Sequence, residues 1–89
     1  EGEVIYVDRY GNAITNLSLV EAGHLLQPVF QVGEHRLRPV THYGAVPIGE
    51  PLVLLGSMDQ FEIAVNGGSA AEKLGLRVGS PVAIQGSHS

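Results

Sequence analysis

The chain has 89 residues, a formal net charge of −4 and no cysteine. This length supports one small domain, and the lack of cysteine excludes disulfides, thiolate metal sites and cysteine nucleophiles. The five basic residues are scattered, whereas nucleic-acid binding needs a clustered basic face. We therefore expect no nucleic-acid partner.

The apolar segments are short. The longest, residues 51–55, is far below the roughly 20 residues that span a bilayer, and no signal-peptide pattern opens the chain. We expect no membrane partner and a cytoplasmic location, which suits a small domain without disulfides. Met58 is the only methionine, so the chain does not begin with an initiator residue. We therefore expect it to be a fragment of a larger protein.

The first part of the chain predicts two strands and a helix. Residues 4–7 and 13–17 are rich in strand-forming side chains, and Gly11 and Asn12 between them tolerate the positive φ of a turn. Ser18 is a favoured N-cap residue, and it predicts a short helix over residues 19–26 that ends before Pro28.

The middle of the chain predicts four more strands. Residues 29–32 and 36–40 form a hairpin around Gly33 and Glu34. Residues 51–56 are apolar throughout, as in a strand buried on both faces. In residues 61–65, Phe61, Ile63 and Val65 alternate with other positions and should share one side.

The last part predicts a turn, a helix and a strand. Residues 66–68 turn the chain, Ser69 caps a short helix over residues 70–74, and Gly75 ends it. Residues 82–85 form the final strand. The fold class is therefore all-β: a small closed antiparallel barrel of about seven strands, Greek-key-like, with two short helices. The barrel domain is expected over residues 1–86 and a tail over 87–89.

Two polar clusters interrupt apolar segments. The first, residues 8–16, contains Asp8, Tyr10 and Asn12; an asparagine amide offers a donor beside an acceptor, which matches an adenine edge. The second, residues 66–71, combines glycines with a helix start whose free amides could meet an acceptor atom. Taken alone, each cluster is better explained by an ordinary turn than by a binding site, the first with local Asx hydrogen bonds.

Catalytic and metal-binding patterns are poorly supported. The histidines have no recognised metal-ligand spacing, so no metal site is expected. Ser57 lacks the glycine-flanked setting of a nucleophile elbow. Glu62 is interpreted as a solvated strand residue. We expect no catalytic residue in this chain.

Residues 67–80 resemble the second half of a PDZ domain, which implies a peptide-binding module. Against this, Ser80 stands where PDZ domains usually have aspartate, and the first half has no glycine-rich carboxylate-binding loop. A PDZ domain would also need a helix after the last predicted strand.

A second resemblance covers nearly the whole chain. Residues 7–17, the segments 41–43 and 49–52, and residues 56–57, 61–66 and 68–75 are similar, in order, to motifs of the C-terminal domain in the S-adenosylmethionine (SAM) hydroxide adenosyltransferase (SAM hydrolase) and chlorinase/fluorinase family. The match implies the barrel domain of a two-domain homotrimeric enzyme, in which SAM lies against the N-terminal domain of a neighbouring subunit.

The resemblance also implies site residues. Asn12 and the backbone at Ala70 would read adenine, and Ser69 beside Ala70 would also belong to the substrate-binding site. Tyr10 and Tyr43 would supply aromatic faces. Asp8 would face the methionine ammonium, and Ser57 the polar end of methionine. Met58-Asp59-Gln60 departs from the family pattern and argues against the fluorinating branch.

The implied reaction is displacement at the ribose C5′ carbon, with water or hydroxide giving adenosine and methionine. SAM is the substrate, no cofactor is implied, and the catalytic groups would lie on the N-terminal domain, so this domain alone would be inactive. Hydrolase and halogenase are not separated by this sequence. A stand-alone structural or oligomerisation barrel remains an alternative, as does the PDZ-like module.

Overall fold

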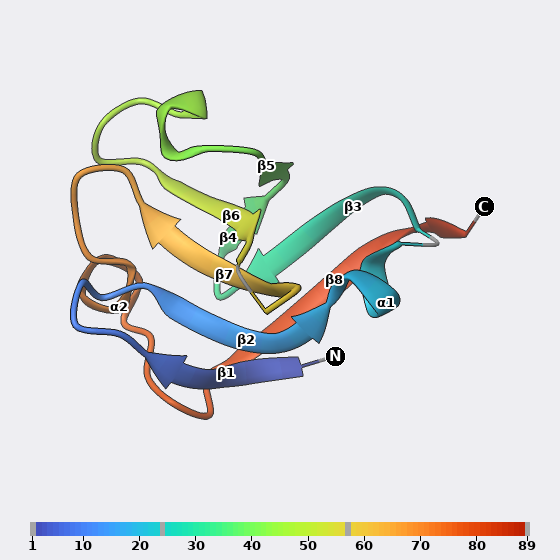
Figure 1. The fold of residues 1–89 in the computed structure, drawn as a ribbon, viewed down its shortest axis with the longest axis horizontal. Helices are drawn as coiled ribbons and strands as arrows, with labels where there is room; N and C mark the ends of the chain where they lie inside the picture. The colour runs from blue at the N-terminus through green and yellow to red at the C-terminus, as the bar shows by residue number, and fades with distance from the viewer. Residues whose placement is uncertain (1, 24, 57, 89) are drawn as a thin grey trace.

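The computed structural model describes residues 2–23, 25–56 and 58–88. It shows an eight-stranded sheet, in the order β4-β3-β8-β1-β2-β7-β6-β5, that curls into a nearly closed barrel (Figure 1). The strands are β1 (Gly2–Val7), β2 (Ala13–Ser18), β3 (Leu25–Val32), β4 (His35–Leu37), β5 (Pro39–Val40), β6 (Pro51–Leu55), β7 (Gln60–Val65) and β8 (Pro81–His88). The predicted all-β barrel is confirmed.

The two outer strands of the sheet, β4 and β5, are consecutive in the chain and separated by Arg38 alone. One strand was predicted over residues 36–40, but Pro39 has no N–H to donate to a ladder, so the segment divides there. β5 then pairs with β6 in parallel, Pro39 opposite Val53, whereas the other pairs are antiparallel. The barrel thus has one more strand than predicted and one parallel pair.

The first helix is shorter than predicted. α1 (Leu19–Ala22) ends before Gly23, and β3 begins at Leu25. Pro28 lies inside β3, where the register with β8 shifts and Gln27 has a φ of 49°. A proline at such an irregularity removes no ladder hydrogen bond, so it does not mark the end of a helix here.

The end of the chain also differs from the prediction. Residues 87 and 88, expected as a tail, continue β8 and pair with Leu26 and Leu25. Backbone pairing with the longer β3 accounts for this extension without an apolar pattern. By contrast, α2 (Ala70–Leu74) has its predicted bounds, with Ser69 as N-cap and Gly75 ending it in the left-handed conformation.

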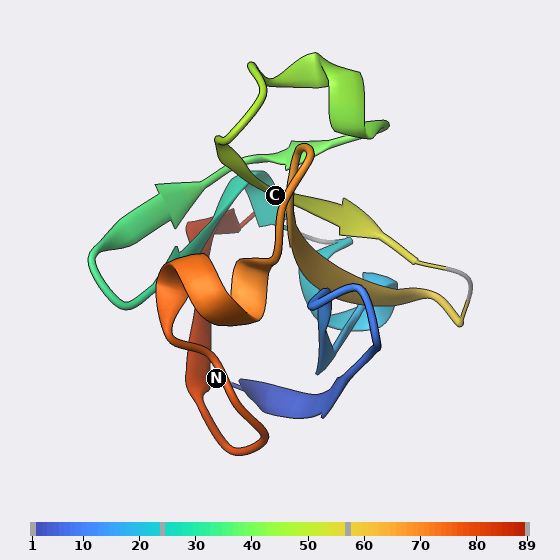
Figure 2. The ribbon, with the colours of Figure 1, turned by 90° about the vertical axis from the view of Figure 1, so that its left-hand side faces the viewer.

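The core lies inside the barrel. Phe30 and Phe61 meet at its centre with ring centroids 4.7 Å apart, and the predicted inward side chains Phe61, Ile63 and Val65 are buried. α2 lies across one end of the barrel (Figure 2), where Ala70 joins the core. β6 is buried on both faces at the adjacent residues Leu52 and Val53, as predicted, but this cover does not extend to Leu55, which is exposed.

In the described part of the chain, no helix is long and apolar enough to cross a membrane.

The described core contains one buried polar side chain, Thr15 on β2. Its hydroxyl donates to the Phe61 carbonyl at 2.7 Å and accepts from the Leu17 amide at 3.2 Å. The same hydroxyl therefore joins β2 to β7 and stabilises the local backbone of β2, where the register between these strands shifts.

We expect Thr15→Val to lower the free energy of unfolding by about 1–3 kcal/mol, because two buried backbone groups would lose their partner. Thr15→Ser keeps the hydroxyl and should cost only about 1 kcal/mol for the lost methyl group. Urea denaturation measures both, with the exposed Thr41→Val as control. A smaller loss for Thr15→Val than for Thr15→Ser would contradict this account.

Candidate functional site

The turn between β1 and β2 is organised by the Asp8 carboxylate. Asp8 Oδ1 accepts hydrogen bonds from the backbone amides of Tyr10 at 2.9 Å and Asn12 at 3.0 Å. Asp8 Oδ2 accepts from Asn12 Nδ2 at 3.3 Å. The local Asx-type turn considered from the sequence is therefore present, and it holds the Asn12 side chain against the carboxylate.

The structure brings the two predicted polar clusters together. The carbonyl of Gly11 accepts from the Ala71 amide at 2.9 Å. Gly11 has a φ of 85°, and a Cβ at this position would collide with Ser69 Oγ. Only glycine allows the backbone to approach α2 so closely. Ser69 is turned to the helix, where its Oγ accepts from the Glu72 amide at 3.2 Å.

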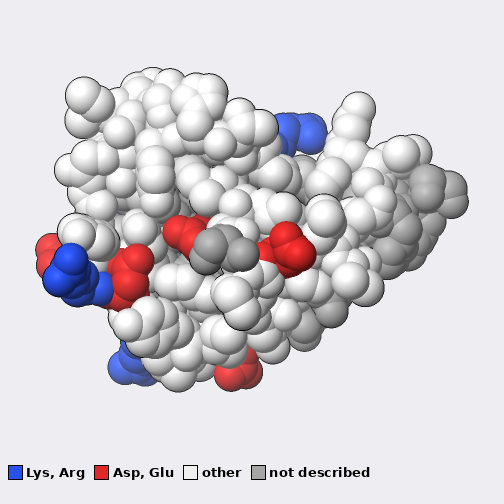
Figure 3. Space-filling view, in the orientation of Figure 1, with Lys and Arg blue, Asp and Glu red and all other residues white. Residues whose placement is uncertain are grey.

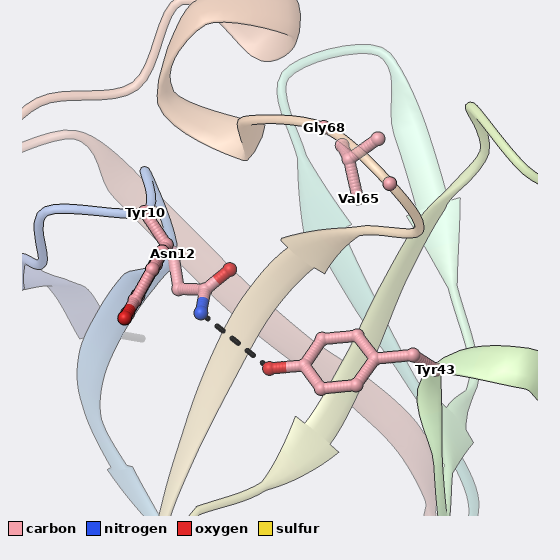
Figure 4. A pocket seen from close by; sticks show the side chains of 6 residues that line it. Tyr10, Asn12, Tyr43, Val65 and Gly68 are labelled. Carbon is pink, nitrogen blue, oxygen red and sulfur yellow. Dashed lines mark hydrogen bonds between the residues drawn. The ribbon is translucent and has the colours of Figure 1, made fainter.

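Tyr43 reaches the same place from a third segment, the connection between β5 and β6. The 3-10 turn η1 (Tyr43–Ala45) carries it. Asn66 anchors this connection, because its Nδ2 donates to the Val46 carbonyl at 2.8 Å and its carbonyl accepts from the Gly49 amide at 2.7 Å. Tyr43 Oη then accepts from Asn12 Nδ2 at 3.4 Å (Figure 4).

These three segments surround an open hollow of about 430 Å³. Its volume is within the range of small-molecule sites. Two tyrosines, a valine and two glycines line it, and Asn12 adds an amide. The lining residues are Tyr10, Asn12, Tyr43, Val65, Gly67 and Gly68.

The surroundings of the hollow are negative. Glu62 lies on β7 opposite Ile14 of β2; burial, and after it the nearby Asp8, raises the pKa of Glu62. Burial, Glu62 and Asp8 also raise the pKa of Tyr43, although the hydrogen bond from Asn12 lowers it. In the view of Figure 3, acidic side chains cross the middle of the face, and the basic ones lie toward its outline.

The predicted site residues fall into three groups. Tyr10, Asn12 and Tyr43 line the hollow. Asp8 is not among the lining residues, but it accepts a hydrogen bond from the Asn12 side chain. Ser69 and Ala70 lie behind Gly11, with Ala70 fully buried. Ser57 lies outside the described residues.

Two features of the site were missed from the sequence. Val65 lines the hollow although its alternation pattern assigned it to the core; it is the last residue of β7 and contributes to both. Glu62 was interpreted as a solvated strand residue, yet it lies beside Asp8 and Tyr43. Glu62 lies beside these residues because β7 pairs with β2, and no local sequence pattern predicts that pairing.

The chain is similar to known proteins over nearly its whole length. A family model described as the SAM hydroxide adenosyltransferase C-terminal domain matches residues 2–83. The chain is 45% identical over 84 residues to the (R)-S-adenosyl-L-methionine hydrolase of Thermus thermophilus, covering 94% of this chain. It is 36% identical over 85 residues to the protein of the same name from Salinispora tropica, covering 92% of this chain. Both alignments cover 31% of the relative, so the chain spans about a third of these proteins.

Two solved structures share the fold. A conserved hypothetical protein from Thermus thermophilus superposes with a TM-score of 0.81 at 43% identity, over 94% of this chain and 34% of that one. An uncharacterized conserved protein from Thermotoga maritima superposes with a TM-score of 0.77 at 31% identity, over 94% of this chain and 35% of that one.

We expect Gly11→Ala to destabilise the protein more than Gly79→Ala. Both positions have positive φ, which costs a non-glycine residue about 1–2 kcal/mol. Nothing lies within 4 Å of a Cβ at Gly79, whereas at Gly11 it would meet Ser69, adding about 1–3 kcal/mol of overpacking. Urea denaturation compares the two, and equal losses would show that the Gly11–Ser69 contact relaxes freely.

A pH-dependent effect is expected at Glu62. The folded state holds its proton more tightly than the unfolded state, whose pKa is near 4.5, so the contribution of Glu62 to stability falls as pH rises through the folded pKa. Glu62→Gln removes this loss. The free energy of unfolding of Glu62→Gln minus that of the wild type should therefore be larger at pH 7 than at pH 4. A difference independent of pH in denaturation experiments would contradict the raised pKa.

Proposed function

The chain belongs to the family of SAM hydroxide adenosyltransferase C-terminal domains, and from this membership we propose that it is the nucleoside-binding domain of a larger SAM-cleaving enzyme. The observation that carries the proposal is the hollow in which the Asn12 amide stands with two tyrosines. An amide that can bond a base edge, together with aromatic faces, suits a purine nucleoside.

The base is read by Asn12. Within the described residues, the side-chain hydrogen bonds of Asn12 to Asp8 and Tyr43 both use Nδ2, which leaves Oδ1 as an acceptor for the adenine 6-amino group. Tyr10 and Tyr43 flank the base with their rings. The family resemblance gives the backbone at Ala70 a second contact with the base, but Ala70 is fully buried and does not line the hollow, so the proposal depends on Asn12.

The remaining half of SAM carries positive charge on its sulfonium and ammonium groups. Asp8 faces the ammonium, whereas Ser57, expected at the polar end of methionine, lies outside the described residues. The neighbouring carboxyl groups of Asp8 and Glu62 support this orientation, because opposite charges favour each other.

The enzyme transfers the adenosyl group to water or hydroxide. The attacking oxygen forms a bond to C5′ as the C5′–S bond breaks, methionine leaves with the electron pair, and adenosine forms after loss of a proton. The groups that position the nucleophile lie on the N-terminal domain of a neighbouring subunit in a homotrimer, so the isolated domain is inactive. Tyr10 and Ile48, 66% and 84% exposed, offer that domain an apolar contact surface.

The two alternatives fare differently. The PDZ-like module is not favoured, because the family model that matches residues 2–83 is that of the SAM hydroxide adenosyltransferase C-terminal domain. A barrel that serves only oligomerisation would give the hollow no ligand, and the binding experiment below separates it from the proposed function.

We expect the full-length enzyme to release adenosine and methionine from SAM, and Asn12→Ala to raise KM about 10–100-fold, because the base loses a hydrogen bond in a desolvated site. Asn16→Ala is the matched control: it removes the same amide group from an exposed position on β2, where Asn16 Oδ1 accepts from the Glu3 amide away from the hollow. Its KM should stay at the wild-type value.

Isothermal calorimetry of the full-length enzyme with SAM tests binding separately from turnover. Absence of SAM binding would overturn the proposed function. Unchanged affinity in Asn12→Ala, with trimers intact, would instead favour the oligomerisation barrel.

A further inference from the structure

We infer that Asp8 sets the base specificity of the hollow by fixing the orientation of the Asn12 amide, so that the site selects a 6-amino purine over a 6-oxo purine. This inference rests on the proposed function, since it assumes that a purine nucleoside occupies the hollow. Asp8 acts here as a positioning residue for the base, in addition to any contact with the amino-acid half of SAM.

The orientation follows from the donors and acceptors around Asn12. A carboxylate has acceptors only, so the group of Asn12 that faces Asp8 Oδ2 at 3.3 Å must be the NH₂ group. The second N–H of this group is directed to Tyr43 Oη at 3.4 Å. Tyrosine can donate or accept, so Tyr43 tolerates either orientation, and Asp8 decides between them.

Asp8 itself cannot turn to relax this constraint. Its Oδ1 accepts from two backbone amides, those of Tyr10 and Asn12, and the turn depends on both bonds. The carboxylate is therefore held with Oδ2 toward Asn12.

The Asn12 oxygen consequently faces the ligand side. In Figure 4, Nδ2 points to Tyr43, and the carbonyl oxygen points to the side of the hollow where Val65 and Gly68 lie. An acceptor in this position bonds the N–H of a 6-amino group. It is repelled by a 6-oxo group, which is also an acceptor. A purine with hydrogen at position 6 gains nothing and loses little.

The first test uses wild-type full-length enzyme and three nucleosides: adenosine, purine riboside, which lacks a 6-substituent, and inosine. All three lack the methionine half, so a contact between Asp8 and the ammonium does not enter. We expect adenosine to bind about 10–100-fold more tightly than purine riboside, and inosine to bind more weakly than purine riboside. Inosine binding as tightly as purine riboside, or more tightly, would overturn the inference.

The second test is Asp8→Asn. The new amide keeps its oxygen toward the two backbone donors and places its NH₂ group toward Asn12. Asn12 then turns its own oxygen to that donor and presents NH₂ to the ligand, so inosine should bind more tightly than purine riboside, and the preference for adenosine should fall at least tenfold. A folded Asp8→Asn variant with the wild-type order would contradict the role of Asp8. If the variant does not fold, the wild-type series decides.

The matched control is Tyr43→Phe, which removes the other partner of the Asn12 NH₂ group and leaves Asp8 in place. We expect all affinities to fall together and their order to stay that of the wild type. A reversed order in Tyr43→Phe would assign the orientation to Tyr43 and overturn the inference. Failure of the proposed function looks different: none of the three nucleosides would bind the wild-type enzyme.

Discussion

The hydrogen bonds accepted by the Asp8 carboxylate hold the β1–β2 turn in a single conformation, and the site depends on that turn. Two backbone amides and the Asn12 side chain converge on one carboxylate. The conformation directs the Gly11 carbonyl to the Ala71 amide and so brings the start of α2 against the turn. A polar group that makes several charge-assisted bonds is well suited to this task, because such bonds are about twice as strong as neutral ones.

Local chemistry predicted much of the fold. Ser69 and Gly75 bracket α2 as their side chains require, and the alternation of Phe61, Ile63 and Val65 identified a buried strand face. Two of the errors share a cause: the proline positions were interpreted without the strands that pair with them. Pro28 lies at an irregularity of β3, and Pro39 divides one predicted strand into two, and both outcomes depend on which strand lies alongside.

Most residues of the site were predicted from the sequence, but their positions relative to one another were not. Turn chemistry identified the segments around Asn12 and Gly67, and the family resemblance added Tyr43. The proximity of Glu62 to Asp8, however, comes from pairing between strands far apart in the sequence. The anchoring of the Tyr43 segment by Asn66 is equally non-local. Long-range pairing of this kind has no signature in a single sequence, whereas a cap or a tight turn has one.

The position of β8 has a consequence for how the chain acquires this structure. The last strand lies between β1 and β3, two of the first three to be synthesised. Until it emerges from the ribosome, β1 lacks one neighbour and the interior around Val4 and Phe30 stays open to water. The barrel is therefore completed only after β8 has been synthesised. Non-local pairing of this kind folds slowly, and the nascent chain meanwhile exposes unpaired strand edges, a state in which chaperones bind partly folded proteins.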